Sequence, residues 1–431
     1  MTEVLPHVAM AGPRKRDSFY TSSQVHHRHG LDSDGSSTES KIHISNDHQS
    51  TQKPLLIPPS FPPSKKDALD LDKDNKPDHS QNHHHHHHHH HHHDHAKAKP
   101  PTWAQYLAQR QLKFPLRLLA TVALAHSLPA LRPYTSKLLY IQYVTPDGWA
   151  TIGKDDAYFV SLWVVILVFT RAALMEYILL PTAQYLGINT KKAKIRFAEQ
   201  GWMLVYYLTA WVIGMYLLEQ SEYSRSIQAL WIGWPHYKMH VGLKAYYLVQ
   251  LACWISQIYV LNVEERRKDH VQMFTHHIVT CLLVTGSYYY YYTRVGHVIL
   301  ILMDVVDAML STAKMLKYLG FNQACDVAFG VFLVGWITCR HGLYNYITWS
   351  AIAEVGDIIE KKCYYTPDGG RCFTSTVQFV FVALLVALQI ITLIWLYMIM
   401  GVVVKILKGG SAEDNRSDDE SDDEDEDEHD E

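Results

Sequence analysis

The feature that most limits how this chain can fold is a series of long apolar stretches. The last of them, residues 373–404, contains no charged residue. A helix needs about 20 apolar residues to cross the hydrocarbon core of a bilayer. The sequence therefore predicts an all-α membrane protein with about eight spans, near residues 115–133, 157–180, 200–219, 243–263, 271–292, 295–317, 326–348 and 376–404. Arg117, His126 and Pro129 interrupt the first stretch, so seven spans remain an alternative.

Two polar regions flank the apolar stretches. Residues 1–100 are rich in Ser, Pro, His, Asp and Lys without hydrophobic periodicity, which predicts disorder. The histidine run 83–93 is typical of a solvated repeat, with a metal-binding tract as the alternative. The expected organisation is a disordered N-terminal region (1–100), a first span with its connection (101–156), a membrane domain with the active site (157–408) and a disordered acidic tail (409–431).

Basic residues indicate the topology. Residues 101–412 carry 26 Lys and Arg against 17 Asp and Glu, and most of these bases lie at the ends of apolar stretches. Membrane topology explains this excess better than nucleic-acid binding, so no nucleic-acid partner is expected. With the N-terminus in the cytosol, the cytosolic loops collect the bases at 191–196, 266–268, 314–317 and 405–408. Eight spans then place both termini in the cytosol.

The six cysteines form no CxxC pair. Four belong to or adjoin apolar stretches, where cysteine packs as a small hydrophobe. Cys363 and Cys372 share a polar loop. They would form a disulfide if this loop faces an oxidising lumen, and the sequence leaves the bonded and free states equally open.

Ionisable residues inside spans are costly and are therefore functional candidates. His276 and His277 lie in the fifth stretch, and Asp304 and Asp307 in the sixth. The aspartates, three residues apart, share a helix face, whereas adjacent histidines point about 100° apart and cannot do the same task. At 1.5 Å per residue, His276 and Asp307 reach a similar depth. A polar network that locks two helices is the structural alternative.

Other charged groups in the spans can be explained without a catalytic role. Arg171 and Glu176 lie toward the end of the second stretch, where mutual pairing or snorkelling accounts for them. Arg340 and His341 lie toward the end of the seventh stretch and are either interfacial or functional.

A buried histidine with two aspartates suits acyl transfer. The histidine would act as general base or as nucleophile near neutral pH. One aspartate on its far nitrogen would fix the tautomer, and a second carboxylate would hold a cationic amine. This set predicts transfer from a thioester to an amine without a metal or other cofactor.

The ordered motif around these residues resembles the Lag motif of ceramide synthases, within the layout of a TLC domain. It comprises His276–Thr280, Ser287-Tyr288, Arg294–Gly296, Met303–Asp307 and Ala313–Tyr318, with similar residues at 266–269 and 336–341. The resemblance covers about residues 115–408 and is closest to the fungal branch. It departs at Val306, where many relatives have Ser, and at Leu310-Ser311-Thr312, where many have Glu.

The resemblance implies a multi-spanning enzyme of the endoplasmic reticulum whose TLC-type bundle encloses a lipid cavity. Such enzymes join a fatty acyl-CoA to the amino group of sphinganine, phytosphingosine or sphingosine. The implied catalytic residues are His276, His277, Asp304 and Asp307, with His276 as a candidate acyl carrier. The implied substrate-binding residues are Ser287, Arg294, Lys314, Arg340 and His341. A homo- or heterodimer with a paralogue and a small single-span accessory subunit are expected partners.

Two segments suggest regulation and specificity. The tail sites Ser417 and Ser421 fit an acidophilic kinase such as casein kinase 2, with an acidic solubilising tail as the alternative. The loop 349–376 lies over the end of the expected acyl tunnel, where we expect it to help set acyl length.

Two other functions compete. A membrane di-iron desaturase or hydroxylase would use His236 and His240, but too few further histidines follow for two irons. A non-catalytic TLC-domain lipid sensor, carrier or proton-relay transporter could use the same helices. It would not need the full set of two histidines and two aspartates.

Overall fold

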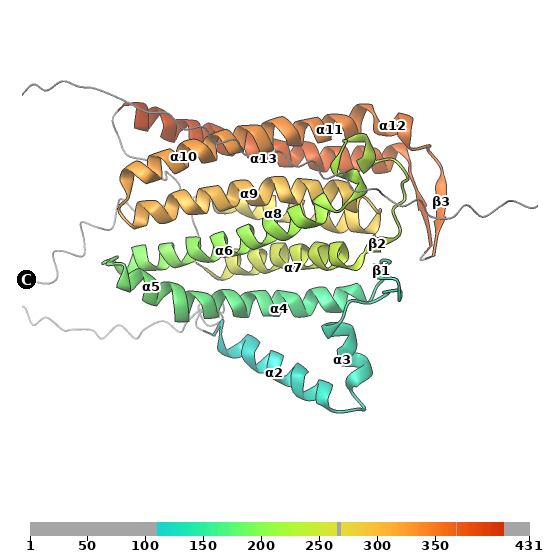
Figure 1. Ribbon diagram of the computed structural model, residues 1–431, viewed down its shortest axis with the longest axis horizontal. Coiled ribbons are helices and arrows are strands. Elements are labelled where there is room, and N and C mark those ends of the chain that lie inside the picture. The colour runs from blue at the N-terminus through green and yellow to red at the C-terminus, as the bar shows by residue number, and fades with distance from the viewer. Residues whose placement is uncertain (1–109, 265–268, 368, 409–431) are drawn as a thin grey trace, which may run out of the picture. The chain divides into compact units, whose positions relative to one another are not determined.

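The computed structural model describes residues 110–264, 269–367 and 369–408, which belong to one compact unit, His93–Glu431. Long helices dominate these residues (Figure 1). The expectations for residues 1–100, for the bases at 266–268, and for Ser417 and Ser421 lie outside the described residues. The helices are α2 (Lys113–Ser127), α3 (Arg132–Leu139), α4 (Asp156–Leu174), α5 (Leu180–Tyr185), α6 (Lys191–Glu219), α7 (Val241–Val263), α8 (His270–Tyr289), α9 (Thr293–Tyr318), α10 (Asn322–Trp336), α11 (Tyr344–Ala353), α12 (Val355–Ile358) and α13 (Ser375–Leu407).

Short elements complete the fold. Two π-helical segments, η1 (Met175–Leu179) and η4 (Ile337–Leu343), join α4 to α5 and α10 to α11. The 3-10 turns η2 (Glu222–Ser224) and η3 (Gln228–Leu230) lie between α6 and α7. Strand β1 (Trp149–Ala150) pairs with β2 (Met239–His240), and β3 (Cys363–Thr366) pairs with β4 (Gly369–Cys372), both antiparallel.

Five of the described helical stretches are long and apolar enough to cross a membrane. They are Asp156–Tyr185, Lys191–Glu219, Thr293–Tyr318, Asn322–Ala353 and Ser375–Leu407. Helices α7 and α8, of 23 and 20 residues, fill two more of the predicted positions.

The first predicted span is shorter than expected. Helix α2 has 15 residues and spans only about 22 Å at the usual rise per residue, short of a core of about 30 Å. It ends at Leu128 in an extended conformation (φ −84°, ψ 119°), as expected for the residue before a proline. Pro129 therefore limits this segment.

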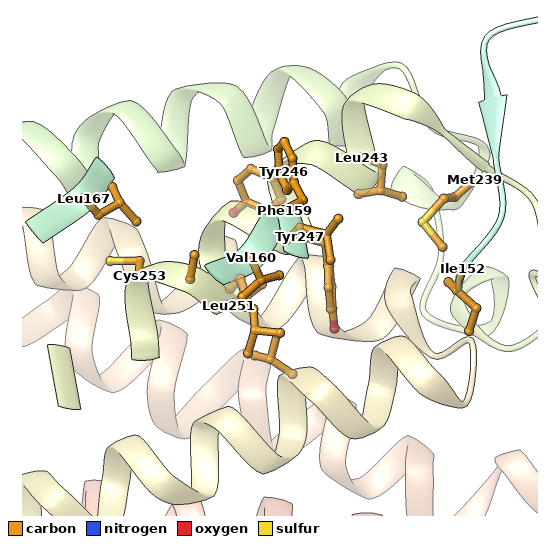
Figure 2. Close-up of a cluster of buried hydrophobic side chains, with 14 of the residues drawn as sticks. Ile152, Phe159, Val160, Leu167, Met239, Leu243, Tyr246, Tyr247, Leu251 and Cys253 are labelled. Atoms are coloured by element: carbon orange, nitrogen blue, oxygen red, sulfur yellow. The ribbon is translucent and has the colours of Figure 1, made fainter. Parts of the chain in front are cut away.

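The helices that carry the motif lie inside the bundle. Helix α9 packs against α6 and α10, α8 packs against α7 and α13, and α7 packs against α4. Figure 2 shows the core between α4 and α7, where Phe159, Val160 and Leu167 meet Tyr247 and Leu251. This packing fixes the position of α7. Helix α7 in turn packs against α8, which carries His276 and His277.

The four strands lie at one end of the bundle, called here the hairpin end (Figure 1). Cys363 and Cys372 face each other in the β3–β4 register and are joined by a disulfide. The remaining four cysteines are free. The opposite end, with the start of α6 and the end of α13, is called the basic end.

A buried lysine ties the hairpin end together. Lys244 at the start of α7 is fully buried, and its Nζ lies 2.7 Å from Oδ1 of Asp156 in α4. The same ammonium donates to the carbonyl oxygens of Gln142 and Thr151 at 2.8 and 2.6 Å. Tyr288 in α8 donates to Oδ2 of Asp156 at 2.8 Å. Lys244 therefore donates two hydrogen bonds to backbone carbonyls and balances the charge of Asp156 through an ion pair.

Candidate active site

The two motif histidines share one helix and differ in their surroundings. His276 and His277 are both buried in α8, and their rings lie 5.5 Å apart at an angle of 87°. Both rings contact the indole of Trp254, with centroids 5.3 and 5.4 Å away, but their hydrogen-bond surroundings differ. The two side chains therefore have separate roles to fill.

His277 is held at both ring nitrogens. Its Nδ1 lies 2.5 Å from the carbonyl oxygen of Met273, and its Nε2 lies 3.0 Å from Oε1 of Gln257. Carbonyl and amide oxygens only accept, so the neutral ring donates to one of these two oxygens, from Nδ1 or from Nε2 according to its tautomer. These bonds fix the orientation of the His277 ring.

His276 is held by aromatic contacts instead. Its ring lies between the indoles of Trp254 and Trp395, with centroids 5.3 and 5.0 Å away. Its buried Nδ1 has no hydrogen-bond partner in the described part of the chain. His276 is therefore the histidine of the pair with unused hydrogen-bonding capacity.

Two cavities of opposite character meet beside His276. The apolar cavity, about 80 Å³, extends from His276 toward the hairpin end between Leu283, Val295, Phe381 and Phe373. The polar cavity, about 210 Å³, extends toward the basic end. Its charged lining residues are Arg171, Arg196, Glu199, Glu264, Asp269, Asp307, Lys314 and Arg340. Four residues line both cavities and form the junction: Trp254, His276, Asp307 and Arg340.

Asp307 faces this junction together with an arginine. Arg340 Nη2 donates to Oδ1 of Asp307 at 2.6 Å, and the guanidinium lies 4.2 Å above the ring of Trp336. Arg340 belongs to the π-helical segment η4. The junction thus holds an imidazole beside a carboxylate–guanidinium pair.

Asp304 lies apart from the junction, although it shares a helix with Asp307. It is 1% exposed and is not among the residues that line either cavity. Gln250 Nε2 donates to its Oδ2 at 2.6 Å, and the Tyr246 hydroxyl lies 3.5 Å away. Asp304 therefore joins α9 to α7. The described hydrogen bonds of Asp304 go to α7, and Asp307 pairs with Arg340, so the aspartate–imidazole contact stays a prediction.

Of the predicted substrate-binding residues, three line the cavities. Ser287 lines the apolar cavity and shares a hydrogen bond with the Tyr247 hydroxyl. Lys314 lines the polar cavity, and Arg340 lines both. These positions are compatible with contact to a ligand.

Two other predicted residues have packing roles. Arg294 donates to the carbonyl oxygen of Ala229 at 3.0 Å and lies 5.3 Å from the ring of Tyr223. His341 accepts from Trp336 Nε1 at 3.0 Å and contacts Gln389 at 2.7 Å. Neither lines either cavity.

Further charged and histidine residues have local partners. Arg171 pairs with Glu264 at 2.5 Å, which corrects the expected pairing with Glu176. His236 contacts the carbonyl oxygen of Ile232 at 2.9 Å, and His240 accepts from the amide of Gly242 at 3.2 Å to cap α7. Among the described residues, no group of three His, Cys, Asp or Glu side chains is arranged to hold a metal ion.

The sequence did not predict a place in the site for Trp254, Gln257 or Trp395. An indole inside an apolar stretch carries no periodic or charge signal that separates it from core packing. Gln257 and Trp254 are three residues apart in α7 and so share a helix face. That spacing was the only available signal.

Comparison with known proteins places the chain in a family. A TLC-domain family model matches residues 196–401. The sphingosine N-acyltransferase-like protein ALT7 of Alternaria alternata is 41% identical over 64% of this chain and 70% of the relative. Sphingosine N-acyltransferase lag1 of Schizosaccharomyces pombe is 39% identical over 67% and 74%, and ceramide synthase FUM18 of Gibberella moniliformis is 36% identical over 70% and 76%. The chain therefore belongs to the ceramide synthase, or sphingosine N-acyltransferase, family of TLC-domain membrane proteins.

Proposed function

We propose that the protein transfers a fatty acyl group from acyl-CoA to the amino group of a sphingoid base, sphinganine or phytosphingosine, to form a ceramide. The observation that carries the proposal is the position of His276 where an apolar and a charged cavity meet. An acyl-CoA is divided in the same way, because its acyl chain is apolar, its CoA group is charged, and the thioester lies between them. Its reactive carbonyl would lie at the junction.

The cavities suggest where each substrate lies. The acyl chain occupies the apolar cavity toward Phe373, and CoA extends through the polar cavity past Lys314. The long base enters from the lipid and brings its amine to the junction beside Asp307. Arg340 holds Asp307 in place through their ion pair.

His276 acts as general base or as transient acyl carrier. As base it takes a proton from the attacking amine, a C–N bond forms and the C–S bond breaks, and CoA leaves as a thiolate that takes up the proton. As carrier it is acylated first and then releases the acyl group to the amine. His277, with both nitrogens bound, orients α8 beside it, and Asp304 holds α9 against α7. The reaction uses no cofactor, and acyl-CoA is a substrate.

The cellular setting follows from the charge distribution and the family. We propose that the basic end faces the cytosol, with both termini on that side, in the endoplasmic-reticulum membrane. The hairpin end then faces the lumen, in agreement with the Cys363–Cys372 disulfide. A dimer, homomeric or with a paralogue, and a small single-span subunit are the proposed partners. Ser417 and Ser421 are proposed phosphorylation sites, and replacing both by Ala would lower phosphate incorporation into the tail.

Expression in a host that lacks its own ceramide synthases tests the function. Membranes receive sphinganine or phytosphingosine with acyl-CoAs of different chain lengths, and mass spectrometry measures the ceramides formed. Wild-type protein is expected to form ceramide, and His276→Ala is not, at equal expression. Absence of ceramide from folded wild-type protein, with and without the accessory subunit, would contradict the proposal.

A further inference from the structure

Several polar atoms without partners belong to residues that line the two cavities. Among the described residues, nine buried side-chain nitrogen or oxygen atoms lack a hydrogen-bond partner, and five belong to residues that line the cavities. Such atoms are rare because an unsatisfied buried group destabilises the fold. The five are His276 Nδ1, Thr280 Oγ1, Tyr292 Oη, Arg340 Nε and Trp395 Nε1.

Trp395 in α13 differs from three other buried tryptophans. The indole N–H groups of Trp231, Trp234 and Trp336 donate to Ser350 Oγ, the Tyr290 carbonyl and His341 Nε2, at 2.8, 2.8 and 3.0 Å. Trp395 is equally buried, at 4% exposed, and its Nε1 has no acceptor among the described residues. Since an indole N–H can only donate, the group lacks an acceptor that the described protein does not supply.

The position of Trp395 points to the missing acceptor. Its ring centroid lies 5.0 Å from that of His276, at an angle of 70°, and it lines the polar cavity. A carbonyl brought to His276 for attack would therefore come beside this indole. In acyl transfer the carbonyl oxygen gains negative charge, and a fixed donor aimed at it lowers the barrier.

We propose that Trp395 is a catalytic residue whose Nε1–H donates to the oxygen of the thioester carbonyl and of the tetrahedral intermediate. This inference rests on the proposed acyl transfer. As the nucleophile's new bond to the acyl carbon forms, the carbonyl π pair moves onto oxygen, where Nε1–H stabilises it. The pair then returns to re-form C=O as the C–S bond breaks and CoA leaves as a thiolate, which takes the proton lost by the amine.

Trp395→Phe removes the N–H and keeps an aromatic ring. We expect kcat for ceramide formation to fall about 100-fold, with KM for acyl-CoA changed by less than about 3-fold. The melting temperature should not fall as it does in the matched variant Trp234→Phe, because Trp395 Nε1 has no protein bond to lose. Trp234 lines neither cavity, so its variant should keep kcat. A Trp395→Phe enzyme within 3-fold of the wild-type kcat would overturn the inference.

A binding measurement separates this inference from the proposed function. An S-(2-oxoalkyl)-CoA keeps a carbonyl near the reacting position, and an S-alkyl-CoA of equal chain length does not. Trp395→Phe should weaken binding of the first about 5-fold and leave the second unchanged. Equal losses for both would refute the hydrogen bond, whereas inactive wild-type protein would refute the proposed function and this inference together. If the Phe variant does not accumulate, β-(3-benzothienyl)alanine at position 395 replaces the N–H by sulfur in a ring of the same shape, with the same expected outcomes.

Discussion

Two buried polar clusters in this molecule follow opposite rules. At the hairpin end, Lys244 is fully buried, donates to two backbone carbonyls and is ion-paired with Asp156. At the junction and beside it, His276 and Trp395 are almost as buried, and each leaves a ring nitrogen without a partner in the described chain. A satisfied cluster holds helices together. An unsatisfied cluster is stable only because the surrounding packing holds it, and its unpaired polar atoms are available to bind a ligand.

The largest expected effect tests the unsatisfied cluster. His276→Ala should lower ceramide formation at least 1,000-fold, because it removes the base or acyl carrier. The melting temperature in detergent should fall only through the lost contacts with Trp254 and Trp395, since His276 Nδ1 has no hydrogen bond to lose. His277→Ala is the matched control, because it breaks two hydrogen bonds and should lower the melting temperature more. If the two variants lost stability equally, the distinction between the histidines would be wrong.

The next effect tests the satisfied cluster. Lys244→Met leaves Asp156 buried without its cation and should lower the free energy of unfolding by about 3–5 kcal/mol. The rate per folded molecule should stay near the wild-type value, because Lys244 lines neither cavity. The double variant with Asp156→Asn should recover part of the stability. A lost rate with intact stability would reverse the comparison between the clusters.

A smaller effect concerns a third buried imidazole, His236, in the loop before β2. Burial, with repulsion from Arg294, lowers the pKa of His236 to about 4. In the unfolded chain His236 binds a proton near pH 6.5, whereas in the folded chain it does so only near pH 4. The free energy of unfolding therefore falls as the pH drops from 6.5 toward 4. We expect a loss of about 2 kcal/mol between pH 6.5 and 5. His236→Gln should flatten this part of the stability–pH curve, and an unchanged slope would assign the loss to other groups.

The smallest effect changes products instead of rate. Phe373 closes the apolar cavity at the hairpin end and follows the disulfide residue Cys372. Phe373→Ala should lengthen the cavity and shift ceramides toward longer acyl chains while the total stays within about 2-fold. Replacing residues 349–376 by a relative's loop should also change the preferred length. Mass spectrometry of the ceramides tests both predictions. An unchanged distribution of acyl lengths would show that this loop does not set the acyl length.

The sequence predicted the elements of the site better than its connections. Apolar length and helical spacing were enough to place His276, His277, Asp304 and Asp307 on neighbouring buried helices. They were not enough to separate Asp304 from Asp307, because that depends on Gln250 and Arg340, which come from other helices. Trp395 carries no pattern of its own, since its importance lies in an unmade hydrogen bond. The first span was predicted over residues 115–133 with Pro129 as an interruption, whereas α2 ends before this proline, at Ser127.

The π-helical turn around Arg340 makes the site sensitive to insertions and deletions. Segment η4 closes its backbone ring over five residues instead of four, and it contains Arg340. Removing one residue from Ile337–Leu343 would restore the ordinary helical register and turn every side chain that follows, or precedes, by about 100°. Homologues that keep the Arg340–Asp307 pair are therefore expected to keep the length of this turn even where its other residues vary. In an alignment, a one-residue gap in this turn would identify a homologue that has lost the Arg340–Asp307 pair.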